Sequence, residues 1–239
     1  MPDEPLLPLS PRQATALGSA TAKAVAAYRP RAGSDRLPRI PEQVLVALVG
    51  LLRQETAEDR AAGRRAAHAT HARVRAGVRG GLTGAFGAPG LVPTEVVGLV
   101  EQARAGVGAT VDRDADRTDA QIASDLLVAW GLLDDAAAAE AIADGSADGS
   151  LLDALVARGG QLLRDAIPDR WTPWSTLKLL WRMRQLPGLR ERFSAKGLRS
   201  RGLRAIPIFG ALPSAVGSWR DMTAFQRRLS AHHRAVGVG

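Results

Sequence analysis

The chain of 239 residues contains no cysteine, few aromatic residues and very little lysine. The absence of cysteine excludes a disulfide framework, a thiol nucleophile and a cysteine-ligated zinc or iron–sulfur site. Aromatic residues make up only 4% of the chain, yet five of the ten are tryptophan. Apolar residues make up 46%, which excludes wholesale disorder and suits a single domain with a sizeable core.

Charge is distributed unevenly along the sequence. The formal net charge of +8 resolves into +6 over residues 1–80, −9 over residues 81–160 and +11 over residues 161–239. Arginine supplies 29 of the 32 cations, and a codon bias would explain that preference but not the clustering. Such clustering indicates a basic face directed at an anionic partner, either nucleic acid or lipid headgroups.

No targeting or membrane-spanning segment stands out. Residues 1–12 hold two early acids and several prolines, which predicts a short tail and not a signal peptide. A spanning helix needs about 20 apolar residues in a row. The longest uncharged stretches, 80–94 and 205–219, have 15 residues each and are interrupted by glycine and proline. Each suits a buried hairpin, a re-entrant loop or an interfacial segment, and a cytoplasmic location is the simplest expectation.

The spacing of apolar residues predicts an all-α chain. Apolar residues recur at helical intervals at Val44, Leu45, Leu48, Leu51 and Leu52, whereas the alternation typical of strands is absent. We therefore expect one helical domain over residues 13–239, a compact multi-helix bundle with glycine/proline-rich apolar hairpins. The expected helices cover residues 13–28, 42–79 with a break at Gly63, 94–111, 119–130, 136–143, 151–167, 173–186 and 218–233.

No motif for catalysis or metal binding emerges. Aspartates alternate along residues 112–116 as in a calcium loop, but Arg117 stands where that loop needs glycine. Nucleophile-elbow, phosphate-loop and zincin motifs are absent. The sequence therefore favours a non-enzymatic role with no metal and no cofactor, although a site assembled in three dimensions stays open. The four histidines are expected on the surface: His68, His71, His232 and His233.

The densest functional signal lies in residues 171–204, where three tryptophans precede a series of cations. Tryptophan favours the membrane–water interface, and each cation near an anionic surface contributes about 1 kcal/mol. The alternative is an ordinary amphipathic helix whose tryptophans face the core. The predicted membrane- or lipid-binding residues are Trp171, Trp174, Trp181, Trp219, Arg182, Arg184, Arg190, Arg192, Arg199, Arg201 and Arg204.

Two glycine-rich apolar segments carry a resemblance to a known family. The first precedes an apolar helix and an acidic turn at 112–119, and the second follows a basic residue with an Ile-Pro-Ile-Phe-Gly-Ala run. This pattern, over about residues 79–233, resembles the EcsC family. Ser218 departs from the family, which tends to carry asparagine after its C-terminal glycines. The structural motif residues are Gly87, Pro89, Pro93, Pro207, Gly210 and Gly217.

The resemblance implies a helical, membrane-associated accessory protein and supplies no catalytic residues. We therefore expect a peripheral protein on the inner face of the cell membrane, bound to anionic lipid or to a membrane transport complex, with oligomerisation left open. Two alternatives remain: a nucleic-acid-binding or adaptor protein that uses the arginine-rich last third, and a lipid-modifying enzyme. The absence of a helix-turn-helix, zinc-finger or RNA-recognition signature disfavours nucleic acid.

Overall fold

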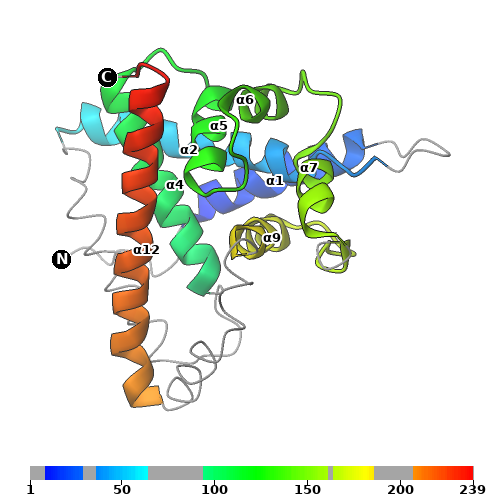
Figure 1. Cartoon of the computed structure of the whole chain (residues 1–239). Helices are drawn as coiled ribbons and strands as arrows, with labels where there is room; N and C mark the ends of the chain where they lie inside the picture. The colour runs from blue at the N-terminus through cyan, green and yellow to red at the C-terminus, as the bar shows by residue number, and fades with distance from the viewer. Residues whose placement is uncertain (1–8, 29–35, 64–93, 161–163, 186–206, 239) are drawn as a thin grey trace.

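A computed structural model describes residues 9–28, 36–63, 94–160, 164–185 and 207–238 (Figure 1). All regular secondary structure within these ranges is helical, so the predicted all-α bundle is confirmed. The helices are α1 (Pro11–Ala27), α2 (Ile40–Ala61), α4 (Thr94–Arg113), α5 (Asp119–Ala129), α6 (Ala136–Asp144), α7 (Leu151–Gly159), α9 (Pro173–Gln185) and α12 (Pro207–Ala235).

Three helices begin with the same reciprocal cap. A serine or threonine side chain accepts a hydrogen bond from the backbone three residues on, and the side chain there accepts one from the cap backbone. Both bonds satisfy N–H groups that have no partner inside the helix. The capping pairs are Ser10 with Gln13, Thr118 with Gln121 and Ser150 with Asp153.

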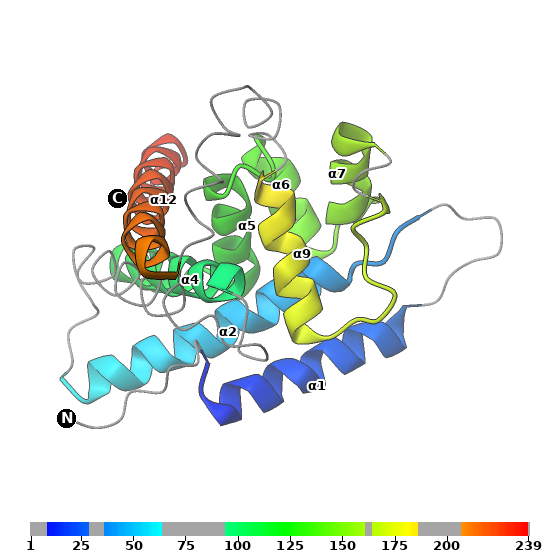
Figure 2. The same ribbon diagram turned by 90° about the horizontal axis from the view of Figure 1, so that it is seen from below.

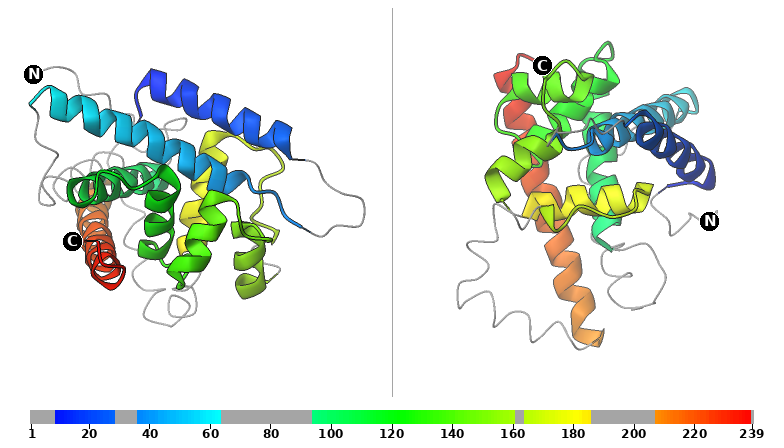
Figure 3. Two further views of the ribbon diagram at one scale, coloured as in Figure 1. Left: turned by 90° about the horizontal axis from the view of Figure 1, so that it is seen from above. Right: turned by 90° about the vertical axis from the view of Figure 1, so that its right-hand side faces the viewer.

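The core lies between α2, α4 and α5. Of the apolar stripe predicted on α2, Leu45, Leu48 and Leu52 are fully buried, whereas Leu51 is partly buried and packs against the core. α1 runs alongside α2 in the opposite direction, α9 crosses α2 and α4, and α6 packs on α5 (Figures 2 and 3). The elements therefore form one hydrophobic cluster.

α12 is the longest helix, with 29 residues, and it lies against α4 and α5 on the outside of the bundle. Met222, Phe225 and Leu229 in its C-terminal half are buried in the core. Its N-terminal half extends beyond the body of the molecule (Figure 1). We call residues 207–218 the projecting half of α12.

Two boundaries differ from the sequence-based expectations. The last helix begins at Pro207 and not near Ser218, so the second apolar segment is a continuous helix from residue 207 onward and not a hairpin there. Proline suits a first helical turn, where its missing N–H has no bond to lose. The helix expected over 151–167 ends at Gly159, because Gly160 adopts a positive φ of 60°.

The remaining motif residues divide between helix and undescribed chain. Gly210 and Gly217 lie within α12, and Pro207 is its first residue. Gly87, Pro89 and Pro93 lie outside the described residues, as does the rest of the first apolar segment up to position 93. α2 ends before Gly63, where a break was expected, and the helix predicted beyond it falls in undescribed chain.

Candidate functional site

Three of the four tryptophans predicted to bind membrane lie on α9 or just before it. Trp171, Trp174 and Trp181 are partly buried and pack against the hydrophobic core. Leu177 and Leu180 of the same helix are fully buried. Because α9 packs on α4 and α2, the bundle covers part of each indole and leaves the rest accessible.

The C-terminal end of α9 is held against α4. A Cβ atom at Gly98 would lie 3.4 Å from Cζ3 of Trp181, so the glycine lets the indole approach the α4 backbone. The guanidinium carbon of Arg184 lies 4.7 Å from the centroid of the Trp181 ring, a cation–π geometry. Arg184 also donates to Gln102 Oε1, which accepts a second bond from Trp130 Nε1 at 3.0 Å.

Arg184 therefore acts at a junction of three helices. Its side chain is 14% exposed, and its Nη2 lies 3.7 Å from Asp221 Oδ2 on α12. The prediction grouped Arg184 with the cations that contact headgroups, whereas the structure places its guanidinium among α4, α9 and α12. Arg182, two residues earlier, is exposed and is the α9 arginine with access to a surface partner.

The most exposed member of the predicted tryptophan set lies on α12. Trp219 is 41% exposed, and the neighbouring Arg220 is exposed as well. Arg220 is not among the predicted residues, although its position beside the uncharged stretch was visible in the sequence. Because Asp221 pairs with Arg184, Trp219 lies where α12 meets the end of α9. The other predicted cations fall outside the described residues: Arg190, Arg192, Arg199, Arg201 and Arg204.

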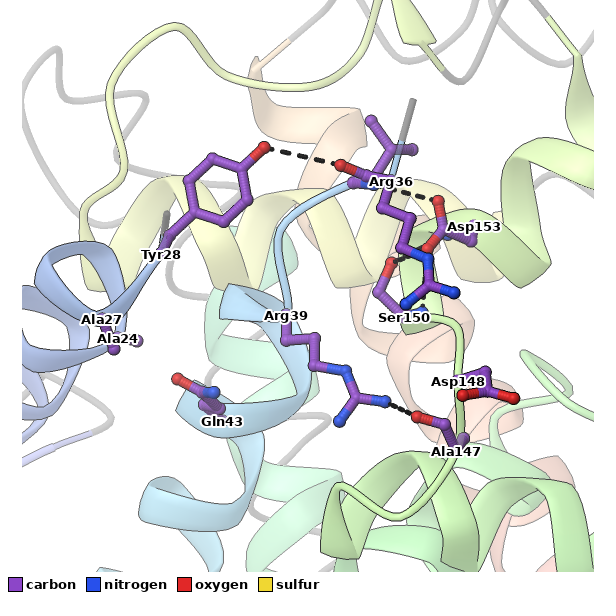
Figure 4. A pocket seen from close by; sticks show the side chains of 11 residues that line it. Ala24, Ala27, Tyr28, Arg36, Arg39, Gln43, Ala147, Asp148, Ser150 and Asp153 are labelled. Atoms are coloured by element: carbon purple, nitrogen blue, oxygen red, sulfur yellow. Dashed lines mark hydrogen bonds between the residues drawn. The ribbon is translucent and has the colours of Figure 1, made fainter. Parts of the chain in front are cut away.

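A cavity of about 370 Å³ lies between the end of α1, the start of α2 and the α6–α7 loop (Figure 4). Arg39, the residue before α2, donates to the carbonyl oxygens of Gly145 at 2.6 Å, Gly149 at 3.0 Å and Ala147. One guanidinium thus holds a loop distant in sequence. Other lining residues are Tyr28, Leu37, Gln43, Ser150 and Asp153.

The wall beside this cavity also joins α2 to α7. Asp153 Oδ1 accepts from the Leu37 N–H at 3.0 Å, and Glu42 Oε1 accepts from the Leu151 N–H at 3.3 Å. Burial raises the pKa of the Glu42 carboxyl to about 7, and its Oε2 has no hydrogen-bond partner among the described residues. Since these groups satisfy the chain's own backbone, they form a structural joint. No sequence motif predicts these contacts between the start of α2 and the start of α7.

A buried polar cluster fastens α12 to α5. Asp125 is 1% exposed, and its Oδ1 accepts from Arg117 Nη2 at 2.8 Å and from His232 Nε2 at 2.9 Å. His233 Nε2 lies 3.6 Å from Asp125 Oδ2, and His233 is fully buried. The expectation of surface histidines is therefore wrong for His233, because α5 covers the C-terminal end of α12.

Arg113 on α4 determines the tautomer of His233. Its Nη1 contacts Nδ1 of His233, and a guanidinium can only donate, so Nδ1 accepts this bond. In the neutral ring the proton is therefore on Nε2, which donates to Thr110 Oγ1 at 3.2 Å. Both contacts attach the end of α12 to α4, and together with Asp125 they define the position of the helix.

Several classes of site find no support in the described part of the chain. No group of three or more histidine and acidic side chains there has an arrangement that could hold a metal ion. No helix among the described residues is long and apolar enough to cross a bilayer. Comparison with protein-family models, with curated proteins and with solved structures found no match for this chain.

Proposed function

We propose that this protein docks peripherally on an anionic membrane surface, as a helical accessory protein without catalytic turnover. The observation that carries the proposal is the projecting half of α12. These twelve residues contain no charged side chain, and they lead to the exposed Trp219 and Arg220. An uncharged arm with an indole and cations at its base suits the boundary between headgroups and acyl chains.

The charge of the last third supports the same partner. Residues 161–239 carry a net charge of +11. The exposed cations in the described part of this region are Arg164, Arg170, Arg182, Arg220, Arg227, Arg228 and Arg234. At about 1 kcal/mol per cation near an anionic leaflet, a few such contacts produce reversible, salt-sensitive binding. An exposed indole adds an apolar contribution that salt does not screen.

We further propose, on the sequence resemblance alone, that the chain is related to the EcsC family and acts at the inner face of the cell membrane. A membrane transport complex that presents anionic lipid or an acidic surface would be a compatible partner.

Flotation with vesicles tests the proposal. The full chain should float with phosphatidylcholine vesicles that contain phosphatidylserine, and binding should fall as salt is added. Trp219→Ala should weaken binding about tenfold, the equivalent of about 1.4 kcal/mol. Tyr28→Ala is the matched control, since Tyr28, at 36%, is the other exposed aromatic residue in the described part of the chain and caps the C-terminal end of α1.

Two outcomes would overturn the proposal. If the chain binds none of the lipid mixtures but slows the migration of DNA or RNA in a gel, then the basic last third binds nucleic acid and not lipid. If Tyr28→Ala weakens vesicle binding as much as Trp219→Ala does, then Trp219 has no special part in docking.

A further inference from the structure

We infer, resting on the proposed function, that the outer face of α12 between Arg220 and Arg234 lies along the anionic bilayer, and that its arginines bind the lipid phosphates. Arg220, Arg227 and Arg234 are exposed and follow one another at intervals of seven residues. Seven residues are almost two full turns of an α-helix, so the three side chains leave the helix within about 40° of one direction. We call these three residues the arginine stripe.

The arginine stripe lies opposite the face of α12 that the bundle buries. Met222, Phe225 and Leu229 form the buried face, about half a turn away from the stripe. α4 and α5 pack on that side, and α12 lies at the edge of the molecule (Figure 2). On the outer face, the positions between the arginines are the exposed Ala224 and Ala231, whose short side chains leave the guanidinium groups free to reach a flat surface.

No described residue neutralises the arginine stripe. Its three side chains make no ion pair or hydrogen bond within the described part of the chain. Asp221 is the one acid in residues 207–239, and its Oδ2 lies 3.7 Å from Arg184 Nη2 on α9. Arg228, beside the stripe, is exposed and has no ion pair among the described residues either. The outer face of α12 is therefore a positively charged surface whose counter-charge must come from a partner.

The spacing of the arginine stripe suits a planar surface that carries many phosphates. Seven residues of helix span about 10.5 Å, so Arg220 and Arg234 lie about 21 Å apart along the axis. The shorter spacing is about one Debye length at 0.1 M salt, so repulsion between neighbouring arginines is largely screened, whereas each arginine still attracts the phosphate that it touches. A straight helix on a flat anionic surface can thus bring all three guanidinium groups into contact at once.

Exposed apolar side chains at both ends of the arginine stripe favour a bilayer over nucleic acid. Trp219 precedes the stripe and Val236 follows it, and both side chains are exposed. Indole favours the boundary between headgroups and acyl chains, where an apolar ring and a polar N–H are both satisfied. Between these ends the outer face carries arginine and alanine, so it offers no aromatic ring on which a base could stack.

Flotation of two charge-matched variants tests the arginine stripe. The stripe variant carries Arg220→Gln, Arg227→Gln and Arg234→Gln. The control variant also loses three positive charges, at exposed positions that make no ion pair among the described residues: Arg12→Gln, Lys23→Gln and Arg170→Gln. Two of the control positions lie on α1, which is separated from α12 by α2 and α4 (Figure 2).

The two variants should differ strongly in affinity for phosphatidylcholine vesicles that contain phosphatidylserine. The stripe variant should bind about a hundredfold more weakly than the parent, about fivefold for each arginine removed, whereas the control variant should stay within about threefold. A third variant with lysine at the three stripe positions keeps the charge and should also stay within about threefold of the parent. Helical circular dichroism checks that each variant is folded.

Equal weakening by the stripe and control variants, or loss of binding by the lysine variant, would overturn the inference and leave membrane docking intact. Absence of flotation by the parent chain would instead remove the proposed function. If the stripe variant floats as the parent does but no longer retards DNA in a gel, the stripe binds nucleic acid and the inference is wrong. The inference is also wrong if the stripe variant floats normally but sediments as a monomer where the parent is a dimer, because a second copy then covers the stripe.

Discussion

The two halves of α12 belong to one helix and differ in almost everything else. The C-terminal half is held by apolar packing through Phe225 and Leu229 and by the buried contacts of His232 and His233. The projecting half has no charged residue and extends past the bundle (Figure 1). Because a continuous helix is stiff along its axis, the packing of one half determines the direction of the other half. We therefore expect substitutions in the body to change stability, and substitutions at the arm to change binding.

The largest effect on stability should come from Asp125→Ala. The substitution leaves Arg117 and His232 inside the protein without their common acceptor, which costs about 3–5 kcal/mol for a buried ion pair broken on one side. Urea unfolding measures the loss, and hydrogen exchange should quicken in the C-terminal half of α12 more than in α2. Asp148→Ala, at an exposed carboxylate, is the control and should change stability by less than about 0.5 kcal/mol. Equal effects of the two variants would mean that the cluster does not hold α12.

Glu42 should make the stability of the body depend on pH. The folded chain keeps the proton on Glu42 up to a pKa of about 7, whereas the unfolded carboxyl releases it near the ordinary glutamate pKa of 4.5. Between these values the folded state binds more protons, so the free energy of unfolding falls as pH rises, on the order of 3 kcal/mol in all. Glu42→Gln should remove this fall and be more stable than the parent chain above about pH 7, where the parent carries a buried charge.

Thermal unfolding across this pH range measures the effect of Glu42. Vesicle binding by the folded Glu42→Gln variant should equal that of the parent, because α2 and α7 lie away from the projecting half of α12 (Figure 1). A pH profile that Glu42→Gln leaves unchanged would contradict the burial of this carboxyl.

Alanine substitutions at two glycines of α4 should change the stability of the protein in opposite directions. A Cβ atom at Gly106 would lie 2.5 Å from Leu126 Cδ2 and 3.2 Å from Phe225 Cζ, so Gly106→Ala should push α12 and α5 away and cost about 1–3 kcal/mol. Gly108 has nothing within 4 Å of such an atom, and Gly108→Ala should stabilise α4 by up to about 1 kcal/mol. Denaturant midpoints of the two variants test the pair. A stabilising Gly106→Ala would show that α4, α5 and α12 are less tightly packed than the structure has them.

The smallest effect on stability should come from Trp219→Ala, within about 0.5 kcal/mol, because the side chain is 41% exposed. The same variant should show the loss of vesicle binding described above. Leu229→Ala should show the opposite pattern. Because Leu229 is buried, this substitution should lower the free energy of unfolding by about 2–5 kcal/mol, while the fraction of protein that remains folded should bind vesicles as the parent does. If both variants lost stability equally, the distinction between the two halves of α12 would not hold.

Much of the local structure could be read from the chain before any fold was known. The buried stripe of α2 follows from the spacing of Val44, Leu45 and Leu48. The cap at Thr118 and the start of α9 at Pro173 follow from residues within one turn of the boundary. The extent of α12 could not be found in this way, because a proline and glycines inside the segment suggested a turn that the helix does not make.

The amino-acid sequence by itself determined the helical class, most helix starts and the concentration of positive charge in the last third, because these depend on neighbours a few residues apart. Only the tertiary structure decided that His232 and Asp125, 107 residues apart, share a buried hydrogen bond, and that Arg184 lies at a junction. It also separated the partly covered indoles of α9 from the exposed Trp219. The reason is physical: burial and pairing are properties of surfaces that meet when distant segments pack, and no local spacing specifies which surfaces those are.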